Sequence, residues 1–346
     1  MTILWLVMVS LIGAIQYAIP QLTRRDIFFS VTVAPDFRDT AQARRIVAAY
    51  RHGITVVTLI ALAIAIEVGA RGAGLLGAGL LMLELLCAVA VFVLAHRRTV
   101  PFRTAPSTAR EASLDPQLPM PGLVPLLVGP YLLLGAATLT LLSHWNEIPN
   151  PMPVHWDLVG NPNGWMPKTP RIFWMINGAY LLLCLVSTLF VVGIVYYSRR
   201  IAVSEIKLRE EGRFRWIGIG VMLAGSYLIA ALAFLPLYPH IATEFGGVAA
   251  LLVIMSVGAL ELARRGQSGV RLLPSGASEN VADRTPDACW KWGMIYYNPD
   301  DPALMVEKRF GIGWTLNFAH RGAWVCIALI LVAVAFSLSL PMIARR

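Results

Sequence analysis

Runs of about twenty apolar residues recur along the chain, and they constrain its fold more than any other feature. A bilayer core about 30 Å thick is crossed by roughly 20 apolar residues in a helix. Backbone groups in lipid must pair within their own segment, so each run is predicted to be a helix. The expected fold class is an all-α polytopic membrane protein with about eight transmembrane helices. The predicted spans are Thr2–Ile19, His52–Gly69, Gly72–Ala95, Leu123–Ser143, Ile172–Tyr197, Trp216–Leu235, Gly246–Leu262 and Gly322–Pro341.

The composition suits lipid and argues against a soluble enzyme. Of 346 residues, 57% are hydrophobic and 14% are charged, whereas soluble domains carry about 25% charged residues. The first apolar run has no basic residue before it and no small-residue cleavage pattern after it. We therefore expect it to be retained as a helix and not removed as a signal peptide.

The basic residues predict how the chain is oriented. With eight spans, alternate connecting loops on one face carry 24 Lys and Arg residues, and the other face carries 5. Cytoplasmic loops collect basic residues. Both termini and the loop containing His155 are therefore expected outside the inner (plasma) membrane. Because membrane insertion alone accounts for basic residues in alternate loops, the net charge of +9 does not indicate nucleic acid as a partner.

The four cysteines are solitary: Cys87, Cys184, Cys289 and Cys326. Their spacing offers neither a disulfide framework nor a CxxC metal site. We expect no metal site, no cofactor and no catalytic residue, so the protein is predicted not to be an enzyme.

Five segments follow from the predicted spans. Residues 1–122 hold three helices with cytoplasmic loops, and residues 123–197 hold a helix pair joined by an extracytoplasmic loop. Residues 198–263 hold two further helices, residues 264–321 a cytoplasmic linker and β-hairpin, and residues 322–346 the last helix.

The cytoplasmic segments include short predicted strands. Phe28–Val33 is rich in β-branched and aromatic residues, which favours a strand, and Asp39 or Thr40 can cap a helix starting at Ala41. The alternative is a basic loop that only fixes topology. Near the carboxyl end, two strands, Trp290–Asn298 and Ala303–Phe318, are expected.

The two carboxyl-terminal strands are joined by a turn sequence containing Asn298, Asp300 and Asp301. Because a lone hairpin is marginal in water, we predict one small sheet that also includes Phe28–Val33. Gly311 and Gly313 lack the remaining pattern of a phosphate-binding loop and are interpreted as a strand bulge.

The loop Pro149–Trp165 is the most unusual stretch of the sequence. Its prolines and glycines fix backbone conformation, and its tryptophans suit either a specific binding surface or anchoring at the membrane interface. His155 and Asp157 could instead bind a metal, but no metal-binding spacing is present. The candidate binding residues are Pro153, His155, Trp156, Asp157, Gly160, Asn163, Gly164 and Trp165.

Glu84 is the one acidic residue near the centre of a predicted span. A charge at that depth costs roughly 2.5–3.5 kcal/mol on insertion scales, so Glu84 is expected to face the bundle interior or to be protonated. It is either a functional intramembrane site or a neutral acid hydrogen-bonded to a neighbouring helix.

Two runs carry a resemblance to known families. Residues from Pro153 to Trp165, within a match from about Leu123 to Tyr197, resemble the bacterial membrane family of SdpI-like immunity proteins, whose common segment is domain of unknown function 1648. Residues from Tyr296 to Asn317 are similar to a carboxyl-terminal segment of larger relatives, domain of unknown function 5808. The resemblance implies an integral membrane protein with the His155 loop outside.

The leading hypothesis is sensing of, or immunity toward, an envelope-active peptide or lipid through Pro149–Trp165. The alternatives are a small-solute or ion transporter using Glu84, and a membrane-embedded hydrolase. Expected partners are membrane lipid and a peptide toxin or an envelope protein, and the sequence leaves the oligomeric state open.

Overall fold

The computed structural model is mostly helical, with four small two-stranded sheets among the residues it describes. It describes residues 2–23, 26–34, 36–71, 74–104, 122–156, 162–196, 205–237 and 285–344, and part of 253–267. The helices are α1 (Thr2–Leu22), α2 (Ala41–Ala70), α3 (Gly74–Thr99), α4 (Leu123–Ser143), α5 (Pro170–Tyr196), α6 (Glu205–Leu232) and α8 (Arg321–Ala344). The strands are β1 (Ile27–Phe28), β2 (Val31–Thr32), β3 (Met152–Trp156), β4 (Pro162–Met166), β5 (Trp290–Lys291), β6 (Ile295–Tyr296), β7 (Met305–Glu307) and β8 (Trp314–Leu316).

The helical membrane architecture predicted from the apolar runs is confirmed. Within the described residues, six helices are long and apolar enough to cross a membrane. Many large apolar side chains on them stay exposed, among them Leu59, Leu86, Leu132 and Leu139. The predicted span Gly246–Leu262 lies mostly outside the described residues, and α8 coincides with the predicted span Gly322–Pro341. The count of eight is therefore not established.

Two of the helices are longer than predicted. The helix expected from Ala41 and the span expected from His52 are one continuous helix, α2, because no breaker separates them. Thr40 is its cap, as predicted, and the Thr40 hydroxyl accepts a hydrogen bond of 3.2 Å from the Ala43 amide. The span expected from Trp216 likewise begins earlier, because α6 starts at Glu205.

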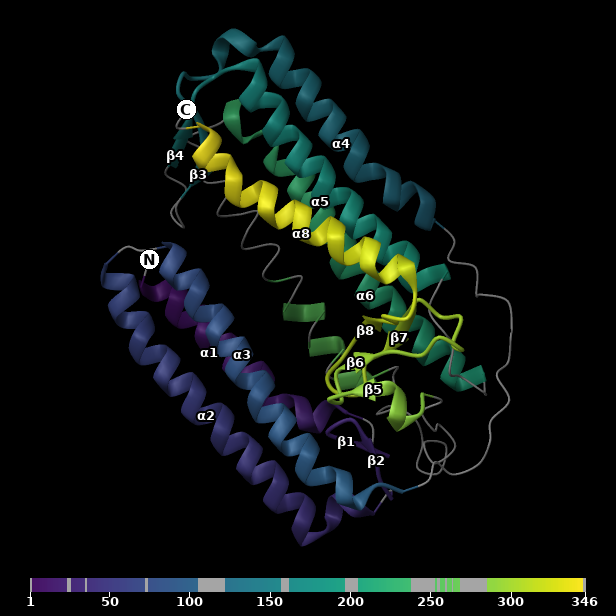
Figure 1. Ribbon diagram of the computed structural model, residues 1–346. Helices are drawn as coiled ribbons and strands as arrows, with labels where there is room; N and C mark the ends of the chain where they lie inside the picture. The colour runs from purple at the N-terminus through teal and green to yellow at the C-terminus, as the bar shows by residue number, and fades with distance from the viewer. Residues whose placement is uncertain are drawn as a thin grey trace.

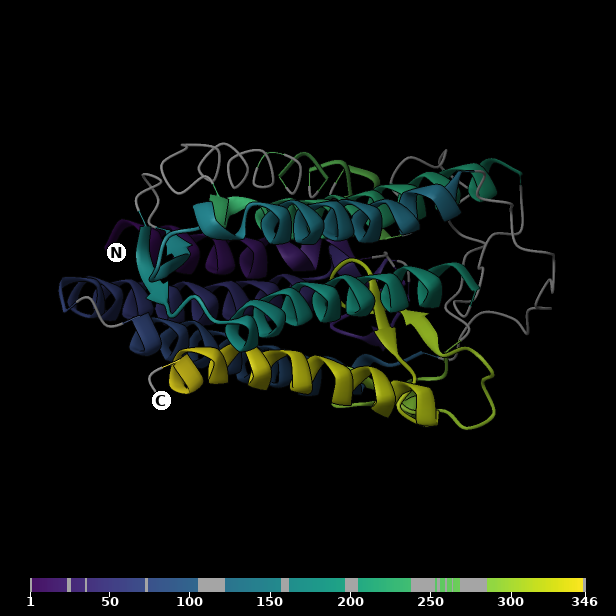
Figure 2. The ribbon, with the colours of Figure 1, turned by 90° about the horizontal axis from the view of Figure 1, so that it is seen from above.

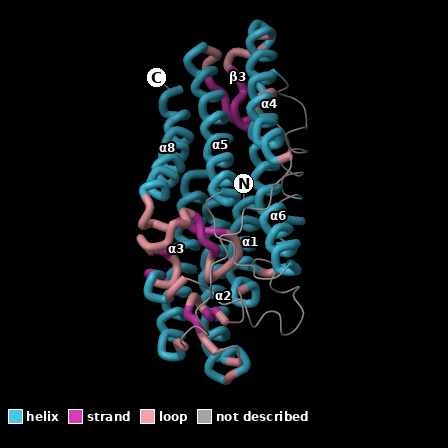
Figure 3. Tube along the Cα trace, turned by 90° about the vertical axis from the view of Figure 1, so that its right-hand side faces the viewer, coloured by secondary structure: helices cyan, strands magenta, loops and turns pink. Residues whose placement is uncertain are grey.

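The helices form two groups (Figure 1). In the first group α2 packs against both α1 and α3, and in the second α5 lies between α4 and α8 (Figure 2). Helix α6 packs on α4 and α5. Both chain ends and the β3–β4 hairpin lie at one end of the helices, and β1–β2 and β5–β8 lie at the opposite end (Figure 1). The β3–β4 hairpin sits over the ends of α4 and α5 (Figure 3).

The prediction of Phe28–Val33 as one strand is wrong. The segment is a hairpin in which β1 and β2 pair antiparallel around Phe29 and Ser30, with φ of 44° and 66°. Positive φ at both central residues is the pattern of a type I′ turn, which usually carries Asn and Gly. Phe29 is 1% exposed and packs in the core of the first helix group. Its burial offsets the backbone strain of the turn. The sequence does not indicate a turn here, because neither Phe29 nor Ser30 is a residue that usually forms one.

The two carboxyl-terminal strands are also hairpins, which corrects the second strand prediction. β5 and β6 pair around a turn at Trp292 and Gly293, and β7 pairs with β8 across a loop that contains Gly311 and Gly313. The glycines have φ of 88° and 105° and form this loop and not a strand bulge.

The predicted single sheet is likewise not formed among the described residues. The sheets remain separate, and a parallel bridge between Tyr296 and Asn317 joins β6 to the end of β8.

The β7–β8 hairpin spans the two helix groups. Its strands place Met305 and Leu316 in a core shared with α5, α6 and α8. Its loop places Phe310 against Phe29 and Phe92 of the first group, with ring centroids 5.4 and 4.3 Å apart. This hairpin therefore belongs to both hydrophobic cores.

Candidate functional site

The β3–β4 hairpin connects α4 to α5 and carries the sequence motif. The strands pair antiparallel, with Pro153 opposite Trp165 and His155 opposite Gly164. The register shifts on either side of His155. Such a bulge turns the strand and redirects side chains, so the hairpin changes direction at the motif histidine.

A hydrophobic floor supports the hairpin from below. Met152 and Ile148 are 1% and 2% exposed and pack with Leu141 of α4 and Phe173 of α5. Leu237, just after α6, packs against the same cluster. Helices α4 and α5 and the short segment after α6 therefore hold the base of this hairpin in place.

Lys168 fastens the hairpin base and was not singled out from the sequence. Its Nζ donates to the carbonyl oxygens of Ile148 and Trp145, at 2.8 and 3.2 Å, and its backbone amide donates to Asn150 Oδ1 at 3.1 Å. The ammonium also lies 5.7 Å from the centre of the Trp145 ring. The only available signal was a basic residue in a loop otherwise almost free of positive charge.

The structure places the predicted binding residues unequally. Pro153 is buried, Gly164 lies opposite His155, and Trp165 is 48% exposed. Asp157 and Gly160 lie outside the described residues, as do the side chains of His155, Trp156 and Asn163. The described part of the motif thus contributes one exposed tryptophan on a supported hairpin.

Polar contacts join α4 and α5 below the hairpin. The Thr138 hydroxyl donates to Asn177 Oδ1 at 3.0 Å, and Asn177 Nδ2 donates to the Phe173 carbonyl at 3.0 Å. A second contact, between the hydroxyls of Tyr131 and Thr188, measures 2.7 Å. Such bonds between apolar helices fix their relative position.

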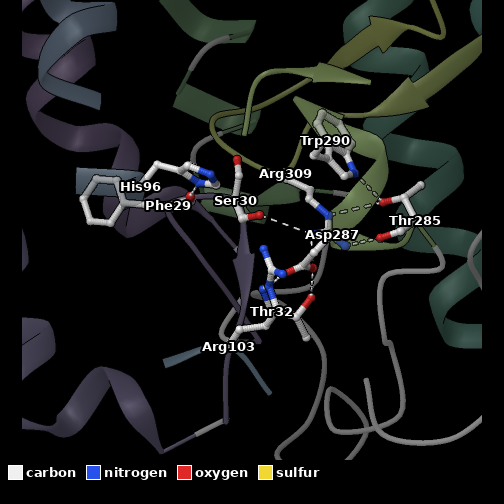
Figure 4. Close-up of polar contacts among 9 residues, drawn as sticks. All are labelled: Phe29, Ser30, Thr32, His96, Arg103, Thr285, Asp287, Trp290 and Arg309. Atoms are coloured by element: carbon white, nitrogen blue, oxygen red, sulfur yellow. Dashed lines mark hydrogen bonds and ion pairs between the residues drawn. The ribbon is translucent and has the colours of Figure 1, made fainter. Parts of the chain in front are cut away.

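A polar latch lies at the opposite end of the helices and consists of Thr32, Arg103, Asp287 and Arg309 (Figure 4). Asp287 pairs with Arg309 at 2.5 Å and with Arg103 at 2.9 Å. It also accepts a 2.6 Å hydrogen bond from the Thr32 hydroxyl. Thr32 and Asp287 are 255 positions apart, so this latch joins the amino-terminal loop to the carboxyl-terminal hairpins.

Asp287 and Arg309 form the buried part of the latch, and their side chains are well hydrogen-bonded. The side chain of Arg309 is 2% exposed and donates to the carbonyls of Ser30 and Thr285. Burial raises the pKa of Asp287, but the Arg309 guanidinium and hydrogen bonds from Thr32 outweigh burial and hold that pKa below its ordinary value. Asp287 is therefore ionised at neutral pH.

The tip of the β5–β6 hairpin fits closely beside the latch. A Cβ added to Gly293 would lie 2.6 Å from His96 Nδ1 at the end of α3, and Gly293 has a φ of 73°. His96 Nδ1 also lies 2.7 Å from the Phe29 carbonyl oxygen (Figure 4). Glycine is thus needed where the carboxyl-terminal hairpins meet the first helix group.

The predicted turn residues form a second network around Asn317. The Asn317 side chain, 0% exposed, donates to the carbonyls of Asn298, Asp301 and Ala303. The Tyr296 hydroxyl donates to the Asp301 carboxylate at 2.8 Å, and burial raises the pKa of Tyr296 above its ordinary value.

Asp300 and Asn298 close the turn itself. The Asp300 amide donates to Asn298 Oδ1 at 3.1 Å, while Asp300 itself is exposed. These contacts give Asn298 and Asp301 a structural role in closing the turn.

Glu84 lies inside the first helix group. It is 3% exposed, and its Oε1 accepts a 3.3 Å hydrogen bond from Thr58 of α2. The described residues contain no group of three or more His, Cys, Asp or Glu side chains placed to hold a metal ion.

Two family models match the chain. The domain of unknown function DUF1648 matches residues 132–177, which include most of α4, the β3–β4 hairpin and the start of α5. The family of unknown function DUF5808 matches residues 299–324, which include the Asp300 turn, the β7–β8 hairpin and the start of α8. No curated protein and no solved structure matches. Both domain resemblances predicted from the sequence are confirmed by these two matches.

Proposed function

We propose that this is a multi-pass protein of the inner (plasma) membrane that senses, or gives immunity toward, an envelope-active peptide or lipid. The ligand would contact the extracytoplasmic loop Pro149–Trp165. One observation carries the proposal. The base of the β3–β4 hairpin is held by an apolar cluster and by the hydrogen bonds of Lys168, while Trp165 of the same hairpin is exposed. A surface held in one conformation loses less entropy on binding.

The orientation of this proposal is supported by the charges. The face assigned to the cytoplasm carries 24 of the 29 basic residues. The strand β2, which contributes Thr32 to the polar latch, and the strands β5–β8 lie at the end opposite the β3–β4 hairpin (Figure 1). Because basic residues are retained in the cytoplasm, both termini and the hairpin would face outward, and the DUF5808 hairpins would face inward.

The test is complementation of a deletion strain. The strain should be screened against envelope-active peptides, and the sensitivity that is found should be rescued by the full chain. Trp165→Ala, His155→Ala and Asp157→Ala are expected to lose rescue at normal expression. Trp174→Ala is the matched control, because Trp174 is 56% exposed on α5 but lies outside the hairpin. Full rescue by all three loop variants would contradict the proposal and leave the loop as a membrane anchor.

Transport is the second candidate function, because Glu84 is a buried acid inside an apolar helix bundle. Loss of substrate-dependent flux in Glu84→Gln, with the loop variants fully active, would favour a small-solute or ion transporter. The third candidate, a membrane-embedded hydrolase, would be supported if the purified chain formed a hydrolysis product.

A further inference from the structure

Glu84 occupies the interior of α1–α3, away from both ends of its own helix. It lies near the middle of α3, and its side chain is 3% exposed. The Thr58 hydroxyl donates to Oε1 at 3.3 Å. Thr58 in turn lies against Gly13 of α1, where an added Cβ would come within 2.2 Å of the threonine Oγ1. A glycine, a threonine and a glutamate from three helices therefore meet at one level.

The second carboxylate oxygen has no partner among the described residues. Glu84 Oε2 is buried and accepts no hydrogen bond from them. A buried ionised oxygen normally gathers several donors or a cation. The single donor from Thr58 is one long hydrogen bond, which is far less than an ionised carboxylate requires.

No basic side chain in the described part of α1–α3 is placed to neutralise Glu84. Helix α1 has no Asp, Glu, Lys, Arg or His, and its titratable group is Tyr17. On α2, Arg51 lies about 10 Å along the helix from Thr58 at 1.5 Å per residue. The Arg51 guanidinium lies over the Tyr17 ring, 4.7 Å from its centre.

His52 of α2 lies about 9 Å along the helix from Thr58 at 1.5 Å per residue, but it is exposed. The other charged groups of these helices sit toward their ends, with Arg44 and Arg45 near the start of α2. Glu67 is at the other end, where it pairs with Arg71 at 2.6 Å. On α3 the basic residues are His96, Arg97 and Arg98 in the last turn, and the titratable neighbour one turn from Glu84 is Cys87.

We propose that Glu84 and Thr58 form a proton-binding site within α1–α3, and that Glu84 holds its proton at neutral pH. The ligand is a single proton. Binding of the proton gives the carboxylic acid form of Glu84, and its release leaves the carboxylate. In the acid form one oxygen accepts from Thr58, and Glu84 adds no charge to the bundle interior. Release of the proton places an uncompensated charge where Gly13, Thr58 and Glu84 meet. The site stands whether or not the β3–β4 hairpin binds a ligand.

Carbodiimide labelling of the full chain in lipid vesicles tests this site. An apolar carbodiimide such as dicyclohexylcarbodiimide reacts with protonated carboxyl groups in an apolar environment. The peptide containing Glu84 should be modified at neutral pH, and above the midpoint its modification should fall about tenfold per pH unit, as for any single titrating group. A water-soluble carbodiimide should spare it. Glu67, whose side chain is 64% exposed, is the matched acid that the apolar reagent should not prefer.

Infrared spectroscopy gives a readout that does not depend on reagent access. The carbonyl stretch of a protonated carboxyl group should be present in the wild-type chain at neutral pH and absent from Glu84→Gln. Thr58→Val should move the pH at which the band is lost, and an unmoved midpoint would remove Thr58 from the site. Absence of this band at neutral pH, or labelling of Glu84 that is independent of pH, would overturn the proposal.

Discussion

The two ends of the helix bundle are built differently. The β3–β4 end is held by an apolar floor and one lysine, with Lys168 bonding to carbonyl oxygens of its own loop. The latch end is held by charges from distant parts of the chain, with Asp287 and Arg309 meeting Thr32 and Arg103. The contacts at the first end come mostly from α4, α5 and the loop that joins them. The second end fixes how the two helix groups sit against each other.

The largest effect is expected at the latch. Arg309→Ala leaves Asp287 buried without its closest counter-charge, and breaking a buried pair costs about 3–5 kcal/mol. Thermal unfolding in detergent should show a large loss of stability. Arg264→Ala is the matched control, because Arg264 is 73% exposed and pairs with Glu261 on the same helical turn, and a surface pair contributes about 0–1 kcal/mol. Equal losses in the two variants would show that the latch does not join the helix groups.

Acid should weaken the latch in a defined direction. The pKa of Asp287 is lower in the folded protein than in the unfolded chain. Its contribution is therefore fully present above the unfolded value of about 3.9 and is lost as pH falls through the folded value. Thermal stability measured against pH should decline at that acid limit, and Asp287→Asn should flatten the decline. Asp300→Asn, at an exposed acid in the same region, should leave the decline as in the wild type.

A smaller and more local effect is expected at the hairpin end. Lys168→Met keeps the aliphatic length but removes the donor to the carbonyls of Ile148 and Trp145. Ile148 is buried whereas Trp145 is partly exposed, so we expect a loss of about 1–3 kcal/mol, the cost of one unsatisfied buried group. Hydrogen exchange should speed up in residues 152–166 and stay unchanged in residues 285–318. Faster exchange at both ends would mean that the two ends are not independent, and the comparison would fail.

The smallest effect belongs to the start of α2. Thr40→Ala removes the hydroxyl that accepts from the Ala43 amide, and losing such a cap costs about 1 kcal/mol. Thr40→Ser, which keeps the hydroxyl, is the control. A loss in circular-dichroism melting temperature that is the same for both variants would assign the effect to packing of the methyl group.

The sequence predicts the helices of this protein well and its small sheets poorly. Apolar runs determine where helices cross lipid, and a local side-chain contact determines the Thr40 cap. Phe29, Ser30 and Trp292 adopt positive φ in hairpin turns although none of them is glycine, because burial and neighbouring contacts support backbone conformations that local propensity disfavours.

The candidate sites show the same division. Glu84 was identified as unusual because a charge in lipid is costly, but its partner Thr58 is 26 positions away on another helix. The Thr32–Asp287 contact spans 255 positions, and a single sequence has no pattern that reports such a pairing. No sequence pattern indicates the role of Lys168, because its partners are backbone carbonyls, which every residue possesses.

The position of Phe310 sets an order for biosynthesis. Its ring completes an aromatic cluster with Phe29, Tyr50 and Phe92, yet it leaves the ribosome long after these three residues. While the later helices are inserted, the aromatic core of the first helix group lacks the Phe310 ring. The loop between β7 and β8 then delivers the missing ring from the membrane surface. A nascent chain cut short before this loop would carry its first three helices in an unfinished state, which quality-control proteases could recognise.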